Sequence, residues 1–153
     1  MFLDRTDKAI LRFLQKDSSV SNLQLSFAIG LSPPACLKRV KRLKKEGVIS
    51  REVALINQEK LGPCLHIIMN IEMERDRLDL NKAFINKMKI APEVKQCYQV
   101  TGDTDFILLV TVADIQSYEA FCKKEIYSET NMKNFRTHIS MNRVKFETSV
   151  LIE

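Results

Sequence analysis

The sequence lacks the features that would hold a chain in a membrane, link it by disulfides or bind a metal. No apolar run approaches the roughly 20 residues of a membrane-spanning helix, and the N-terminus lacks the apolar core of a secretion signal. The four cysteines are scattered without a C-x-x-C pair, which favours reduced, mostly buried thiols over disulfides or zinc. The two histidines stand alone in strand-like runs, so we expect no metal site and no cofactor. Together these absences favour a cytoplasmic protein that makes no membrane contact.

Catalytic motifs are also missing. The sequence has no phosphate-binding loop, no paired-histidine metal motif and no Cys or Ser nucleophile with an evident base. Asp103 and Asp105 share a short turn, but they make no acid–base pair without a pocket that shifts their pKa values. The sequence therefore gives little support to the alternative that the chain is an enzyme acting on an anionic substrate. We predict that the chain is not an enzyme.

Positive charge is confined to the N-terminal part of the chain. The 153 residues carry a net charge of +5, and 45% of them are apolar, which is enough for one domain or two small ones. Residues 1–60 hold 12 Lys and Arg against 6 Asp and Glu, whereas residues 61–153 hold 12 against 13. This asymmetry predicts two modules with different partners, residues 1–60 and residues 61–153.

The N-terminal module begins with two predicted helices. Residues 4–16 carry acidic groups at their start and apolar residues on one side. After a polar break, Ser21 and Gln24 match a capping box for a second helix that stops at Gly30. Only Leu31 then separates Gly30 from the next predicted helix, and so tight a turn predicts a helix-turn-helix.

The third predicted helix is short and strongly basic. Ser32 can cap its start, Pro33 suits its first position and Gly47 can end it. Its apolar stripe consists of Cys36, Leu37, Val40 and Leu43. After it, residues 48–56 are rich in β-forming residues and predict a strand, as in a winged helix-turn-helix.

This arrangement predicts binding to the major groove of duplex DNA by the third helix. Outward-facing residues near its start are candidates for base contact, and basic residues further along are candidates for phosphate contact. The start of the preceding helix can also attract phosphate. The candidate residues are Ser21, Asn22, Gln24, Ser32, Pro34, Ala35, Lys38, Arg39, Lys41, Arg42 and Lys45.

The C-terminal module reads as alternating strands and helices. Strands are predicted over 66–74, 94–101 and 106–113. An extended segment over 134–151 closes the module, either as one piece or as two pieces broken near Asn142–Arg143. Asp79 and Asp114 are predicted to cap the two intervening helices. The order βαββαβ is the ferredoxin-like arrangement, and its uncovered sheet face favours self-association. We therefore predict an α+β chain, a winged helix-turn-helix followed by a ferredoxin-like domain.

A turn between two predicted strands is the candidate small-molecule site. Gly102 allows a ligand carboxylate to approach backbone N–H groups, and Asp103 and Asp105 can accept from an ammonium group. Such turns are common, so the signal is weak by itself, although it suits a free α-amino acid.

The chain resembles the leucine-responsive regulatory protein/AsnC family over nearly its whole length. The stretches that carry the resemblance are Leu3–Leu11, Gly30–Pro33, Cys36–Leu43, Glu46–Ile49, Glu59–Gly62, Val100–Asp103 with Asp105, and Arg136–Thr137 to Val144–Lys145. The sequence departs from the family pattern at several positions. Thr104 stands where an aromatic residue is common, and Phe27 stands where the family tends to be charged. Ser26 occupies a position where Ala is usual, and Pro34–Ala35 replaces a more usual Thr/Ser–Pro pair.

The resemblance implies a prokaryotic transcriptional regulator of amino-acid-related genes. It implies homodimers formed through the C-terminal sheets that assemble into octamers or larger discs. It also implies an amino-acid effector bound beside the Gly102 turn, near a neighbouring subunit's strand. The implied ligand residues are Thr101, Gly102, Asp103, Thr104, Asp105, Thr137 and Ser140.

Two DNA-binding hypotheses remain open from the sequence. In the first, the amino acid favours one oligomeric arrangement, which sets the spacing of the reading helices on a specific site. In the second, the protein coats DNA as an architectural protein without effector control. Comparing specific with random DNA at fixed salt separates the two.

Overall fold

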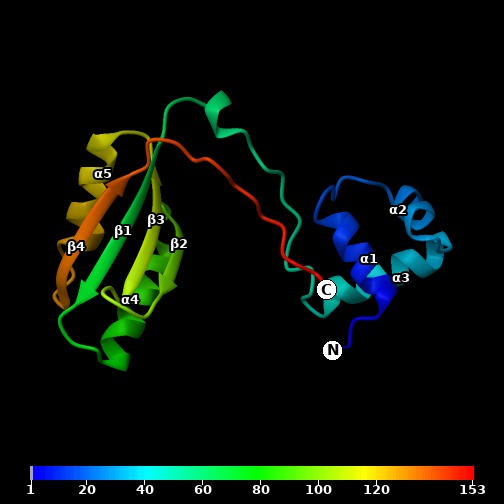
Figure 1. Ribbon diagram of the computed structural model, residues 1–153, viewed down its shortest axis with the longest axis horizontal. Coiled ribbons are helices and arrows are strands. Elements are labelled where there is room, and N and C mark those ends of the chain that lie inside the picture. Colours follow the sequence, from blue (N-terminus) through cyan, green and yellow to red (C-terminus); the bar gives the residue numbers. More distant parts are fainter. Residues whose placement is uncertain (1) are drawn as a thin grey trace. The chain divides into compact units, whose positions relative to one another are not determined.

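The computed structural model describes residues 2–153, apart from the side chain of Glu59; Met1 lies outside this range. The chain forms two compact units (Figure 1). One comprises the residues up to Ile56 together with Lys145–Glu153, and the other is Asn57–Val144. The division falls close to the predicted boundary at 60/61. The sequence predicts that residues 145–153 belong to the second module, whereas in the structure they belong to the first unit.

Three helices form the first unit: α1 (Arg5–Leu14), α2 (Asn22–Ile29) and α3 (Pro33–Lys45). Both α1 and α2 begin with complete capping boxes, Asp4 with Asp7 and Ser21 with Gln24. Gly30 ends α2 in the left-handed conformation (φ 73°), which glycine adopts at little cost. The core of the unit consists of the buried residues Ile10, Leu25, Cys36 and Leu43.

Several local predictions for this unit were wrong. Ser32 stands at the N-cap of α3, but its side chain makes no capping hydrogen bond. Leu37, predicted in the apolar stripe, is 41% exposed because it lies to one side of the buried pair Cys36 and Leu43. Within the described residues, 48–56 form no strand. A strand needs a hydrogen-bonded neighbour, and no strand lies beside this segment in unit 1.

The C-terminal segment packs on α1 instead of extending the sheet. The Arg12 guanidinium donates two hydrogen bonds to the Ile152 carbonyl, at 3.1 and 2.9 Å. The Gln15 side chain donates to the Val150 carbonyl and accepts from the Val150 N–H. These polar contacts to backbone explain why the end of the chain belongs to the first unit.

The second unit is a four-stranded antiparallel sheet with helices on one face. In chain order its elements are η1 (Gln58–Lys60), β1 (Leu65–Met73), α4 (Leu78–Ile90), β2 (Val94–Gln99), β3 (Phe106–Val112), α5 (Ile115–Phe121), η2 (Cys122–Ile126, a π-helical turn) and β4 (Met132–Ile139). The strand order is β2-β3-β1-β4, which confirms the predicted ferredoxin-like arrangement.

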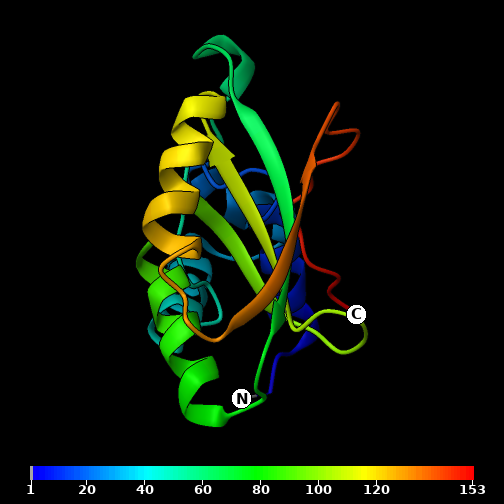
Figure 2. The same ribbon diagram turned by 90° about the vertical axis from the view of Figure 1, so that its left-hand side faces the viewer.

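The alternation of side chains along the strands places the core between the sheet and its helices. Figure 2 shows α4 and α5 on the same side of the sheet. The predicted inward residues of β1 are buried, and Phe84 and Met88 of α4 pack against them. The buried strand residues are Ile67, Met69, Ile71, Met73, Phe106, Leu108, Val110 and Val112.

Two predictions for the second unit need correction. Arg77, not Asp79, occupies the N-cap of α4, and Asp79 instead forms an exposed ion pair with Arg77 in the first turn. The extended segment predicted over 134–151 is a strand only as far as Ile139, where the pairing with β1 also ends. The Asp114 cap of α5 is confirmed, since its side chain accepts from the Ser117 N–H. Among the described helices, none has the length and apolar character needed to cross a bilayer.

Candidate nucleic-acid and effector sites

The turn between α2 and α3 fixes the angle at which α3 is presented. The Leu31 N–H donates to the Ser26 carbonyl at 2.9 Å, and the Asn22 side chain donates to the Pro33 carbonyl at 2.9 Å. Ser26 is fully buried and its hydroxyl bonds the Leu23 carbonyl, so this small residue suits close packing. The predicted helix-turn-helix is therefore present and held by hydrogen bonds across its turn.

Seven predicted DNA-contact residues of the turn and α3 are exposed. Pro34, Ala35 and Lys38 lie near its N-terminal end, where a reading helix meets base edges. Lys41 and Lys45 lie further along, and no salt bridge is present at either among the described side chains. The exposed predicted residues are Ser32, Pro34, Ala35, Lys38, Lys41, Arg42 and Lys45.

The predicted residues of α2 are partly committed to the fold. Ser21 and Gln24 bond one another's backbone N–H groups in the capping box, at 3.2 and 2.9 Å. Asn22 is half-buried and bonds Pro33. Their side chains therefore stabilise the start of α2 and the turn, while the helix N-terminus itself still presents positive potential to a phosphate.

Arg39 and Arg42 make ion pairs inside the first unit. Arg39 bonds Asp4 at 2.6 Å and Asp7 at 2.8 Å, and Arg42 bonds the second oxygen of Asp7. Asp7 is 1% exposed, so both guanidinium groups compensate a buried carboxylate. The prediction that these two arginines are DNA contacts overlooked this structural role, in which they join α3 to α1.

This ionic cluster also shifts titration in the expected directions. The Asp7 N–H and the Arg39 guanidinium lower the pKa of Asp4 below its ordinary value. Asp4 and Asp7 raise the pKa of Arg39 above its ordinary value. The sequence predicts only that acidic groups lie at the start of this helix, and it gives no sign that Asp4 and Asp7 pair with α3.

The β2–β3 turn places the candidate effector residues beside β1. Gly102 has a positive φ of 118°, a backbone conformation in which a residue with a side chain would be strained. The Asp105 carboxylate accepts from the Met73 N–H at 2.7 Å, and the Thr104 hydroxyl donates to the Ile71 carbonyl at 2.7 Å. Asp105 and Thr104 therefore fasten the turn to β1, which reduces their capacity to receive a ligand ammonium.

An open hollow adjoins this turn. It measures about 670 Å³ and is lined by Gln99, Val100 and Thr101. Gly102 and Asp103 follow directly and are exposed. The Val100 N–H donates to the Asp105 carbonyl at 2.9 Å and closes the loop that carries them. Thr101, Gly102 and Asp103 are thus the predicted ligand residues that remain available at the turn.

Thr137 and Ser140 do not meet that turn within one chain. The Thr137 hydroxyl and the Tyr118 hydroxyl of α5 are 2.6 Å apart, on the helix-covered face. The Ser140 N–H donates to the His66 carbonyl at the opposite end of β1 from Ile71. The 137–140 segment of a chain therefore does not contribute to a site at the Gly102 turn of that same chain. Among the side chains that the structure describes, which exclude those of Met1 and Glu59, no three of His, Cys, Asp or Glu are grouped to hold a metal ion.

Both units match known protein families. Residues 3–50 match the winged helix-turn-helix DNA-binding family, and residues 66–150 match the Lrp/AsnC ligand binding domain. The chain belongs to the Lrp/AsnC family. It is therefore a transcriptional regulator with a DNA-binding domain and a ligand-binding domain.

Its similarity to other Lrp/AsnC proteins extends over whole chains. It is 39% identical to the uncharacterized HTH-type transcriptional regulator y4tD of Sinorhizobium fredii, over 100% of this chain and 90% of that protein. It is 36% identical to the transcriptional regulator AzlB of Bacillus subtilis, over 100% of this chain and 98% of that protein. The structure is also similar to the crystal structure of the Neisseria meningitidis regulator NMB0573 in complex with L-Met, with a TM-score of 0.88 and 28% sequence identity. The match covers 98% of this chain and 97% of that chain.

Proposed function

We propose that the protein is a sequence-specific regulator of amino-acid-related genes whose DNA binding responds to a free amino acid. The observation that carries the effector part is the hollow at Gln99–Thr101 beside the exposed Gly102 turn. A turn with a positive φ leaves backbone N–H groups accessible to a carboxylate. The L-Met complex of the Neisseria relative supports an amino acid as the ligand class.

The DNA-binding part rests on α3. Its exposed start offers Pro34, Ala35 and Lys38 to base edges, and Lys41 and Lys45 to the phosphate backbone. Because Arg39 and Arg42 are engaged by Asp4 and Asp7, we assign the main phosphate contacts to the lysines. Such a protein acts where the cell keeps its DNA, so we place it in the cytoplasm.

We also propose that the protein acts as a homodimer that assembles into octamers or larger rings. The sheet face opposite α4 and α5 carries exposed apolar side chains, Ile68 and Tyr98, beside the half-buried Ile107 and Leu109. Exposed apolar surface on a sheet favours burial against a second copy. An effector bound between subunits then favours one arrangement, and with it one spacing of the α3 helices on DNA.

A thermal-shift screen of the twenty amino acids tests the effector. We expect at least one to raise the melting temperature, since a ligand at 100 times its Kd adds about 2.7 kcal/mol of stability. Gly102→Ala should abolish that shift, because a Cβ at φ 118° strains the turn. Gly62→Ala is the matched control: Gly62 has a φ of 119° but lies before β1, away from the turn. A screen in which no amino acid stabilises the wild-type protein contradicts the proposed effector.

A further inference from the structure

Cys64 differs from the other three cysteines in its surroundings. Cys36 belongs to the core of the first unit, Cys122 belongs to the core of the second, and Cys97 packs against that second core. Burial raises the pKa of each of these three thiols, which keeps them protonated and unreactive. Cys64 is half-buried and lies outside both clusters, one residue before β1.

A chain of polar contacts connects Cys64 to a histidine and a threonine. The Cys64 sulfur lies 3.7 Å from Nε2 of His66, and Nδ1 of His66 lies 3.2 Å from the Thr111 hydroxyl oxygen. His66 and Thr111 face each other across the β1–β3 ladder, so the register of the sheet fixes this geometry. In the tautomer whose Nδ1–H donates to Thr111, Nε2 presents its lone pair to the thiol.

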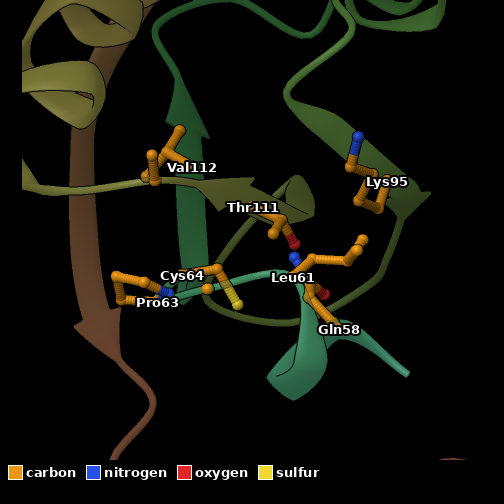
Figure 3. Close-up of a pocket in the computed structure, with 9 residues that line it drawn as sticks. Gln58, Leu61, Pro63, Cys64, Lys95, Thr111 and Val112 are labelled. Carbon is orange, nitrogen blue, oxygen red and sulfur yellow. The ribbon is translucent and has the colours of Figure 1, made fainter. Parts of the chain in front are cut away.

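The thiol also opens onto a cavity. A pocket of about 300 Å³ is lined by Cys64 and Thr111, by the connecting segment at Leu61 and Pro63, and by Lys95 of β2. Figure 3 shows the Cys64 sulfur directed toward Leu61 and Gln58. A molecule of a few atoms can therefore reach the sulfur from the pocket.

We propose that Cys64 is a modification site whose thiol reacts with small hydroperoxides, with His66 as the proton acceptor. His66 takes the thiol proton, and the sulfur attacks the terminal peroxide oxygen. The S–O bond forms as the O–O bond breaks, and the departing oxygen takes the proton back from His66. The products are a cysteine sulfenic acid and water or an alcohol, so sulfur loses two electrons and the peroxide gains them.

The groups around the pocket are compatible with this chemistry. Lys95 lines the cavity, and its ammonium donates to the Pro92 carbonyl at 2.6 Å. Burial and the nearby Arg143 charge lower the pKa of His66, which leaves the imidazole neutral and able to accept a proton at neutral pH. The described lining residues include no carboxylate that would oppose a thiolate.

Isotope-coded alkylation of the native full-length protein tests the proposal. A short pulse of light N-ethylmaleimide is followed by unfolding and heavy reagent, and mass spectrometry gives a labelling rate for each cysteine. We expect Cys64 to react about 10-fold or more faster than Cys97, the other half-buried thiol. We also expect hydrogen peroxide to produce a dimedone adduct at Cys64, which Cys64→Ser removes.

The variant His66→Gln distinguishes proton acceptance by His66 from simple solvent exposure of the Cys64 thiol. His66→Gln should slow labelling of Cys64 about fivefold at neutral pH and flatten its pH profile, while the Cys97 rate stays the same. A Cys64 rate equal to or below that of Cys97 in the wild-type protein overturns the proposal and needs no variant. An unchanged Cys64 rate and pH profile in a folded His66→Gln protein overturns the assignment of His66 as proton acceptor.

Discussion

Replacing Lys38, Lys41 and Lys45 together with Gln should lower the affinity for duplex DNA about 100-fold at 0.1 M salt, because each phosphate contact releases bound counterions. The slope of log affinity against log salt should flatten by about 0.9 for each lysine that contacts a phosphate. A fluorescence-anisotropy titration at several salt concentrations measures both quantities. The lysines are exposed on one helix, so the triple variant should keep its fold.

Lys44→Gln provides the matched control for this experiment. Lys44 belongs to the same helix and carries the same charge, but it pairs with Glu52 at 2.7 Å. We expect its removal to change affinity less than threefold, as for a charge outside the interface. If Lys44→Gln weakens binding as much per removed charge as the triple variant does, net charge explains binding and the α3 face has no special role.

Asp7→Asn should destabilise the first unit by roughly 3 kcal/mol, because it leaves two guanidinium groups without their shared carboxylate. Asp7 is almost fully buried, bonds Arg39 and Arg42, and also accepts from the Asp4 N–H. Urea unfolding of the full-length protein, followed by helical circular dichroism, measures the loss.

Asp17→Asn is the control for loss of a carboxylate. Asp17 is exposed after α1, and its carboxylate accepts hydrogen bonds from the N–H and the hydroxyl of Ser19. We expect Asp17→Asn to change the free energy of unfolding by no more than about 0.5 kcal/mol, as for most surface substitutions. Equal stability of Asp7→Asn and Asp17→Asn would show that the cluster between α1 and α3 contributes nothing.

Local signals in the sequence predicted much of the fold. The Ser21–Gln24 capping box, the Gly30 stop and the alternation along β1 all depend on neighbouring residues, and the structure confirms each. The basic face of α3 was equally visible, because a helix brings residues three and four apart onto one side.

Long-range pairing was not visible in the same way. Asp7 and Arg39 are 32 residues apart, and Arg12 and Ile152 are 140 apart, so no local pattern links them. The candidate site shows the same limit. Sequence placed Gly102 in a turn, but it did not show that Asp105 and Thr104 bond β1, or that Thr137 faces α5. A strand over 48–56 was predicted from composition, which says nothing about whether a neighbour is present to pair with it.

The central claim is that α3 reads a specific DNA sequence under the control of an amino acid bound at the Gly102 turn. Selection from a random duplex pool first gives the sequence that the wild-type protein prefers. Anisotropy titrations at fixed salt then test this claim most directly, by comparing the selected duplex with a shuffled duplex of equal length. We expect tighter binding to the selected duplex by about 1,000-fold or more, and an affinity that changes with the amino acid found by thermal shift but not in Gly102→Ala. Equal affinity for the two duplexes, unaffected by any amino acid, would contradict the account and leave an architectural DNA-coating protein.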